Sequence, residues 1–78
     1  MDATRMLREA ERRLKGQKYQ VIGLMLKGKD TPMTVEIVEI DQASGFVEVK
    51  TVMSKKMRHI LIALDVIAAV NLMDWQPE

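Results

Sequence analysis

Residues 58–73 read Arg-His-Ile-Leu-Ile-Ala-Leu-Asp-Val-Ile-Ala-Ala-Val-Asn-Leu-Met, and this stretch decides the fold. Apart from Arg58, His59, Asp65 and Asn71 it is apolar, and five of its side chains are β-branched. A strand with one face in water alternates polar and apolar residues, which this stretch does not do. Both of its faces must therefore be covered. Because a chain of 78 residues is too short to cover both, we expect a second copy of the chain to do so.

The composition indicates a single small domain spanning residues 1–78. A chain of this length buries only about 60–65 % of its unfolded surface, so a monomer would be marginally stable. It contains no cysteine and one histidine, which excludes disulfides and a zinc site of the Cys/His kind. Small domains without such cross-links are often stabilised by oligomerisation.

The N-terminal residues are charged and lack the apolar segment of a signal peptide. The uncharged runs of the chain are far shorter than the ~20 residues that span a bilayer. We therefore expect a cytoplasmic protein with no membrane partner.

The charges are unevenly distributed although the net charge is only +1. The first eighteen residues hold six basic and three acidic side chains, and Lys50, Lys55, Lys56 and Arg58 form a second basic zone. Such zones are usually solvated faces, but two that meet in space attract a polyanion.

Residues 2–15 are predicted to form a helix. A spacing of three and four places Ala3, Met6, Leu7, Ala10 and Leu14 on one stripe. Asp2 is a suitable N-cap, and Gly16 stands where a helix commonly ends in a left-handed conformation.

The rest of the chain predicts five short antiparallel strands in hairpin succession, over about residues 19–26, 33–40, 46–53, 58–64 and 67–73. Gly23 indicates a bulge or sharp bend, of the kind a small barrel needs to close. The alternative is an α+β fold, in which a C-terminal helix over residues 57–73 packs on a three-stranded sheet. Met57, Leu61, Leu64, Ala68 and Leu72 fit such a helix, but the density of isoleucine and valine favours strands.

A helix followed by five strands resembles the Sm-like family, which includes the Lsm proteins and bacterial Hfq. The segment Val-Glu-Ile-Asp41-Gln-Ala-Ser-Gly45-Phe-Val-Glu-Val resembles its first motif, and residues 60–70, with a break at Asp65, resemble its second. The resemblance implies a mainly β fold: a small, strongly bent, five-stranded antiparallel barrel with one N-terminal helix.

Members of that family form homo-oligomeric rings of six or seven subunits, in which the strand before the break pairs with the strand after it on the next subunit. Such a hexamer or heptamer would explain the apolar character of both faces and would remove exposed sheet edges. The implied interface residues are Ile60, Ile62, Leu64, Ile67, Ala69, Val70 and Leu72.

The family also binds single-stranded RNA, which makes RNA binding the first functional hypothesis. The candidate residues are Asp41, Gly45, Phe46, Lys55, Lys56, Arg58 and His59. The basic residues would neutralise phosphates, and Phe46 is the aromatic placed to stack on a base. The structural interpretation of the same residues is an Asx-turn at Asp41, a solvated loop at residues 55–58 and a polar strand residue at His59.

Two departures from the family pattern favour a second hypothesis. Members that bind uridine-rich RNA commonly carry asparagine where this chain has Gly45, and Arg-Gly where it has Leu64-Asp65. The chain would then be a ring-forming adaptor that has lost the RNA pocket and binds protein partners. A third possibility is a monomeric or dimeric regulator with the C-terminal helix.

Enzymatic activity is not expected. The sequence contains no nucleophile–base pair, no cluster of metal ligands and no phosphate-binding glycine loop. We therefore expect no catalytic residues, no metal, no cofactor and no small-molecule substrate.

Overall fold

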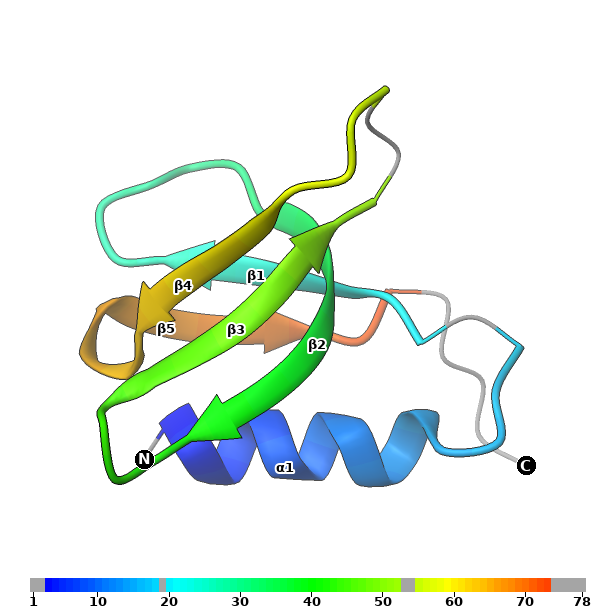
Figure 1. The fold of residues 1–78 in the computed structure, drawn as a ribbon, viewed down its shortest axis with the longest axis horizontal. Helices are drawn as coiled ribbons and strands as arrows, with labels where there is room; N and C mark the ends of the chain where they lie inside the picture. The colour runs from blue at the N-terminus through cyan, green and yellow to red at the C-terminus, as the bar shows by residue number, and fades with distance from the viewer. Residues whose placement is uncertain (1–2, 19, 53–54, 74–78) are drawn as a thin grey trace.

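The computed structural model describes residues 3–18, 20–52 and 55–73, which form one helix and one antiparallel sheet (Figure 1). The elements are α1 (Ala3–Leu14), β1 (Ile22–Leu26), β2 (Met33–Asp41), β3 (Phe46–Thr51), β4 (His59–Ala63), the 3₁₀ helix η1 (Leu64–Val66) and β5 (Ile67–Asn71). The mainly β fold with one N-terminal helix, as expected from the sequence, is confirmed.

The five strands lie in the order β4-β3-β2-β1-β5, and every neighbouring pair is antiparallel. Figure 1 shows β2 curving across the whole sheet, so that its two ends face different directions. Within the described residues no pairing joins β4 to β5, so closure of the sheet into a barrel is not found. The sheet therefore has two edge strands, β4 and β5.

The alternative of a C-terminal helix over residues 57–73 is wrong. Residues 59–63 and 67–71 are strands, and only Leu64–Val66 between them turn into a short 3₁₀ helix. β-Branched side chains lose rotamer freedom in a helix and pack well on a pleated surface. The strands also bury Ile62 and Ile67 in the core, and this burial further stabilises the strand conformation.

Element boundaries agree with the sequence to within a few residues. The helix ends at Leu14 and is followed by Gly16 in the expected left-handed conformation, with φ of 88°. β1 begins at Ile22 rather than residue 19, and β5 ends at Asn71 rather than 73. The positions of Asp2, Tyr19, Met53 and Trp75 lie outside the described residues.

Gly23 does not form the expected bulge. It pairs in register with Thr34 on β2 and Asn71 on β5, and the register shifts occur between Met25 and Leu26 and between Ile37 and Glu39. A Cβ atom at Gly23 would lie 3.2 Å from the Cβ of Asn71. A side chain there would press on Asn71 by a few tenths of an ångström, so glycine suits the close approach of the neighbouring strand.

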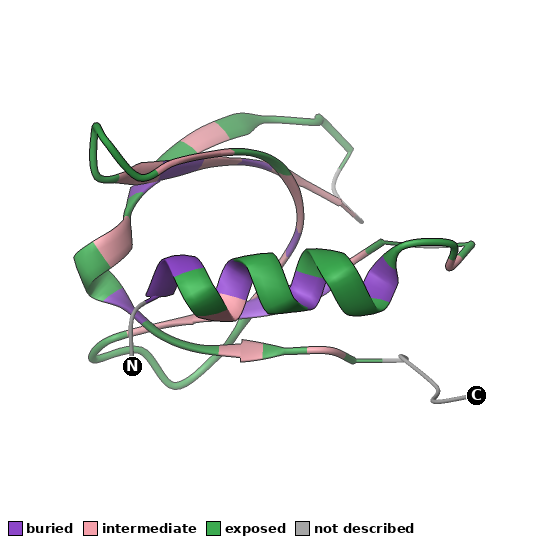
Figure 2. Ribbon diagram, turned by 90° about the horizontal axis from the view of Figure 1, so that it is seen from below, coloured by how far each residue is buried: buried purple, intermediate pink, exposed green. Residues whose placement is uncertain are grey.

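The core lies between α1 and the concave side of the sheet. Buried positions alternate with exposed ones along α1, as the purple and green bands in Figure 2 show. The buried hydrophobic residues are Ala3, Leu7, Ala10, Leu14, Ile22, Leu24, Val35, Val47, Val49, Ile62 and Ile67. All five strands and the helix contribute to this set, so one continuous core holds the domain together.

Within the described residues, no helix has the length and apolar character needed to cross a membrane.

Candidate nucleic-acid interface

The candidate RNA-binding residues fall into two groups at opposite ends of β3. Asp41, Gly45 and Phe46 lie at the turn between β2 and β3, whereas residues 55–58 connect β3 to β4. At about 3.4 Å per residue, the six residues of β3 separate the two groups by roughly 17–20 Å. The candidates predicted from the sequence therefore form two separate groups.

In the first group, the Asp41 side chain is used by its own turn. Its Oδ1 accepts a hydrogen bond from the Ser44 amide at 3.0 Å, and its carbonyl accepts one from the Gly45 amide at 2.9 Å. Gly45 has φ of 82°, a conformation that glycine adopts at little cost. The structural interpretation of Asp41 as the residue that organises this turn is confirmed.

The same turn lies beside the break in the second motif. The Leu64 amide donates a hydrogen bond to the Gly45 carbonyl at 2.9 Å. Phe46 pairs across the strands with Ala63 and is half-buried on the outer face of the sheet. The two segments that carry the Sm-like resemblance, distant in sequence, are therefore in contact.

The second group contains a basic loop, which we define as residues 55–58. Its members Lys55, Lys56, Met57 and Arg58 are all exposed. The base of the loop is fixed to β3, because the Thr51 amide donates a hydrogen bond to the Arg58 carbonyl at 2.9 Å and the Thr51 hydroxyl accepts one from the Arg58 amide at 3.1 Å. This loop presents three positive charges at the start of β4.

Two other nitrogen-bearing side chains near this loop contact carboxylates on the sheet. His59 Nδ1 lies 2.7 Å from Glu48 Oε2, and Lys50 Nζ lies 3.1 Å from Glu36 Oε2. Both pairs join neighbouring strands on the outer face. His59 is thus a polar strand residue in this structure.

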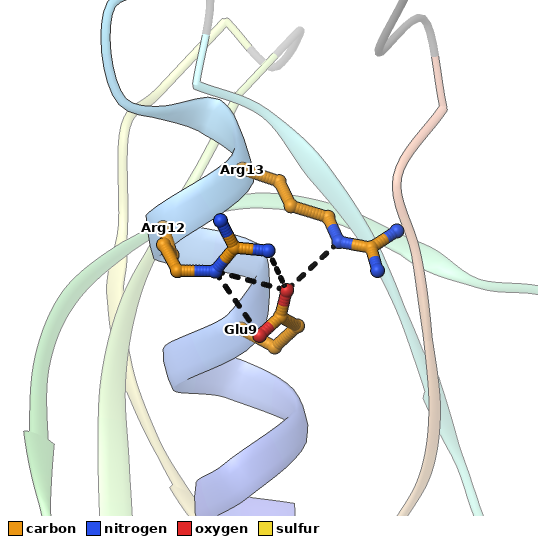
Figure 3. A network of polar contacts seen from close by, with 3 residues as sticks. All are labelled: Glu9, Arg12 and Arg13. Atoms are coloured by element: carbon orange, nitrogen blue, oxygen red, sulfur yellow. Dashed lines mark hydrogen bonds and ion pairs between the residues drawn. The ribbon is translucent and has the colours of Figure 1, made fainter. Parts of the chain in front are cut away.

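Two of the arginines of α1 form hydrogen bonds with a glutamate of the same helix. The Glu9 carboxylate accepts hydrogen bonds from both Arg12 and Arg13, the latter at 2.9 Å (Figure 3). The hydrogen bonds from Arg12, and then from Arg13, lower the pKa of Glu9 to about 2. The Glu9 carboxylate likewise raises the pKa of Arg12. Arg12 and Arg13 also lie in the last turn, where positive charge favours the helix dipole.

These contacts predict a pH-dependent contribution of Glu9 to stability. Because its pKa falls from 4.5 to about 2 on folding, the stabilisation is complete above pH 4.5 and is lost as the pH falls toward 2. We expect Glu9→Gln to lower the urea midpoint slightly at pH 7, and the difference from wild type to shrink below pH 4.5 until little of it is left near pH 2. The effect is small because the pair is exposed.

Glu11→Gln is the control, since it removes the same charge from an exposed position on the same helix. A Glu9→Gln difference that persisted unchanged at about pH 2, or that did not shrink in about 1 M salt, would contradict the ion-pair assignment.

The interface residues expected from the sequence lie on or beside the two edge strands, with unequal exposure. Ile62 and Ile67 belong to the core of the single chain. The remaining members are half-buried or, in the case of Ala69, exposed: Ile60, Leu64, Ala69, Val70 and Leu72.

The most exposed large hydrophobic side chain on an edge strand is one that the sequence reasoning missed. Leu61 on β4 is 63 % exposed, and Val66 in η1 is 39 % exposed. Strand alternation places Leu61 on the face opposite Ile60 and Ile62. The pairing of these two isoleucines with the buried Val49 and Val47 of β3 shows that Leu61 points away from the core. β5 adds the exposed small residues Ala68 and Ala69.

Within residues 3–18, 20–52 and 55–73, no three side chains of the metal-ligating types lie together. No protein-family model, curated protein or solved structure matches this chain. The resemblance to the Sm-like family therefore remains a prediction from the two motifs.

Proposed function

We propose that copies of this chain join edge to edge, β4 of one copy to β5 of the next, into a closed Sm-like ring that binds single-stranded RNA without catalysis. The observation that carries the proposal is that the basic loop leads directly into the edge strand β4. Assembly through β4 would therefore bring one such loop per subunit to the same rim.

The two edge strands, β4 and β5, run in directions that would allow antiparallel pairing between copies. In Figure 1, β4 runs toward η1 and β5 returns from η1 across the molecule in the opposite sense. A second copy that is displaced without being turned over would therefore lay its β4 antiparallel to β5. Antiparallel pairing is also the pattern of every neighbouring strand pair within the chain.

Such a contact is heterologous, because it joins two different surfaces of the same protein. A heterologous contact leaves one open edge at each end of any chain of copies, and a ring removes both when the rotation closes. Ring closure would protect the sheet from edge-to-edge aggregation. The proposal includes a sheet bent strongly enough to form a small barrel. It also includes a ring of six or seven subunits.

RNA affinity would come mainly from repeated positive charge. Each copy contributes three charges from Lys55, Lys56 and Arg58, and each neutralised phosphate releases counterions. Phe46 would supply a stacking surface at the other end of β3, next to η1. Asp41 would hold the turn that presents Phe46 rather than contact RNA itself.

The experiment measures binding of fluorescent uridine- and adenine-rich oligonucleotides by anisotropy at several salt concentrations. We expect binding at low salt, and a Lys55→Gln/Lys56→Gln variant to reduce the slope of log affinity against log salt by about one for each phosphate that it no longer neutralises. Lys27→Gln/Lys29→Gln is the matched control, because both lysines are exposed on the turn after β1. No wild-type binding at low salt would refute the RNA function.

A specific observation favours a second candidate, a ring-forming adaptor for protein partners. The outer face of the sheet around Phe46 carries carboxylates, with Glu39 opposite Glu48 and Asp41 opposite Phe46. These charges would repel phosphates near the stacking position. An assembly that purifies without nucleic acid and binds neither oligonucleotide would support the adaptor function over RNA binding.

A further inference from the structure

We infer that Trp75 docks in the groove between α1 and β5 of its own chain. The occupant is the segment 74–78, Asp-Trp-Gln-Pro-Glu, which lies outside the described residues. The residues that follow the last strand would then cover an apolar surface that the helix and the sheet leave open. The inference goes beyond the proposed function and does not rest on it, because it concerns contacts within a single chain.

The groove is lined by apolar side chains from both sides. Met6 and Ala10 line it from α1, and Val70 of β5 and the following Leu72 line it from the sheet. Its volume is about 420 Å³. A cavity of about 150 Å³ is large enough to bind benzene, so an indole ring fits in this groove.

The rim of the groove is charged, and its net charge is opposite to that of the segment. Arg5, Glu9 and Arg13 line the groove beside the apolar side chains. Figure 3 shows the Arg13 side chain extending from α1 toward β5, with its Nε donating a hydrogen bond to Glu9. Two arginines stand against one glutamate on this rim, whereas segment 74–78 carries two carboxylates and no cation. Arginine is also attracted to the face of a tryptophan ring.

The segment begins beside the groove. Trp75 follows Leu72 by three residues, so the Cα atoms of the two are at most about 10 Å apart. The part of α1 that lines the groove, from Arg5 to Arg13, is about 12 Å long. Since Leu72 itself lines the groove, the covalent chain keeps Trp75 within reach of it.

The chain leaves the direction of β5 just before this segment. The Asn71 side chain accepts a hydrogen bond from the Met73 amide at 2.8 Å, which forms an Asx-turn. Met73 has φ of 53°, a left-handed conformation that residues other than glycine rarely adopt. An extended strand cannot continue through such a residue. A change of direction at this point is what a return to the groove requires.

A segment of the same chain has an advantage over a separate ligand for this groove. A short tether gives an effective concentration in the millimolar range, so even a weak contact is occupied. Docking would also remove two apolar surfaces from water, the indole of Trp75 and the side chains that line the groove.

Trp75 is the only tryptophan of the chain, so its fluorescence reports this contact directly. The reference is a synthetic peptide of residues 71–78, in which the indole is exposed to water. We expect the acrylamide quenching constant of the protein to be severalfold lower than that of the peptide, and its emission to lie at shorter wavelength. Both values should be independent of protein concentration, because the contact lies within one chain.

Met6→Gln tests where the indole lies, because it replaces an apolar wall of the groove with an amide. We expect the quenching constant of this variant to rise toward that of the peptide. Met57→Gln is the matched control, since Met57 is exposed in the basic loop and does not line the groove. Circular dichroism should show both variants folded. Nuclear Overhauser effects from the indole protons to the methyl groups of Val70 and Leu72 test the same contact in the wild type.

Three outcomes would overturn the inference. The first is a quenching constant equal to that of the peptide. The second is protection that is lost on dilution, which would assign the groove to a segment of another copy. The third is protection that Met6→Gln leaves unchanged, without a nuclear Overhauser effect to Val70 or Leu72, which would place Trp75 elsewhere. None of these measurements involves RNA, so this inference and the proposed function can fail separately.

Discussion

If copies of the chain assemble through β4 as proposed, Leu61→Lys is expected to leave a monomer of 8.9 kDa. Leu61 is 63 % exposed on β4 and points away from the core, so a lysine there leaves the fold of the single chain intact. In the proposed contact between copies it would place a charge at the paired edge of β4, and desolvation of that charge opposes association. Natural proteins use lysine on edge strands in the same way, to prevent pairing.

Static light scattering at micromolar concentration measures the effect directly. Val38→Lys is the matched control, because Val38 is also an exposed apolar residue, at 44 %, but lies on β2 in the centre of the sheet. It should keep the mass of the wild type. If the Leu61→Lys variant kept that mass as well, or if Val38→Lys lost it, β4 would not be the contact.

The local structure of this chain could be predicted from its sequence because local signals agree with one another. The apolar stripe of residues 3–14 matches the helical period, and Gly16, Gly28 and Gly45 all adopt the positive φ values that turn signals require. β-Branched residues on both sides of Asp65 predicted two strands with a break, and the break is η1. Each of these features depends on neighbours within a few residues.

Features that depend on distant residues could not be predicted in the same way. Gly23 signals a special backbone position, but its close neighbours, Pro32 and Asn71, are brought to it by the fold, and Asn71 lies 48 positions along the chain. The register shift at Ile37 in β2 has no glycine or proline to mark it. The exposure of Leu61 depends on which face of β4 meets the core, and that is decided by pairing with β3.

The candidate site also depends on contacts between residues that are distant in sequence. Asp41, Phe46 and the basic residues were RNA-binding candidates because all carry chemistry suited to RNA, and β3 lies between the two groups. The contacts that individual side chains make in the structure also bear on the roles expected of them. Glu48 pairs with His59, and Asp41 accepts a hydrogen bond from the Ser44 amide, so neither His59 nor Asp41 is simply a group available to a ligand.

Leu7→Ala is expected to cause a larger loss of stability than any of the other substitutions, about 2–5 kcal/mol. Leu7 is completely buried in the middle of α1, among the side chains that join the helix to the sheet. Alanine is a strong helix former, so the loss reflects the missing side chain and the cavity it leaves. A domain of this length has only about 4–12 kcal/mol of stability in total.

Urea unfolding followed by circular dichroism measures this loss, with Arg8→Ala as the control at the adjacent exposed position. The control should change stability by less than about 0.5 kcal/mol.

If copies assemble, binding stabilises the folded state by mass action, so the midpoint of Leu7→Ala should rise with protein concentration. In the Leu7→Ala/Leu61→Lys double variant the midpoint should be lower and independent of concentration, because that chain must fold alone. A midpoint that never varied with concentration in either background would show that the core alone holds the domain, against the proposed assembly.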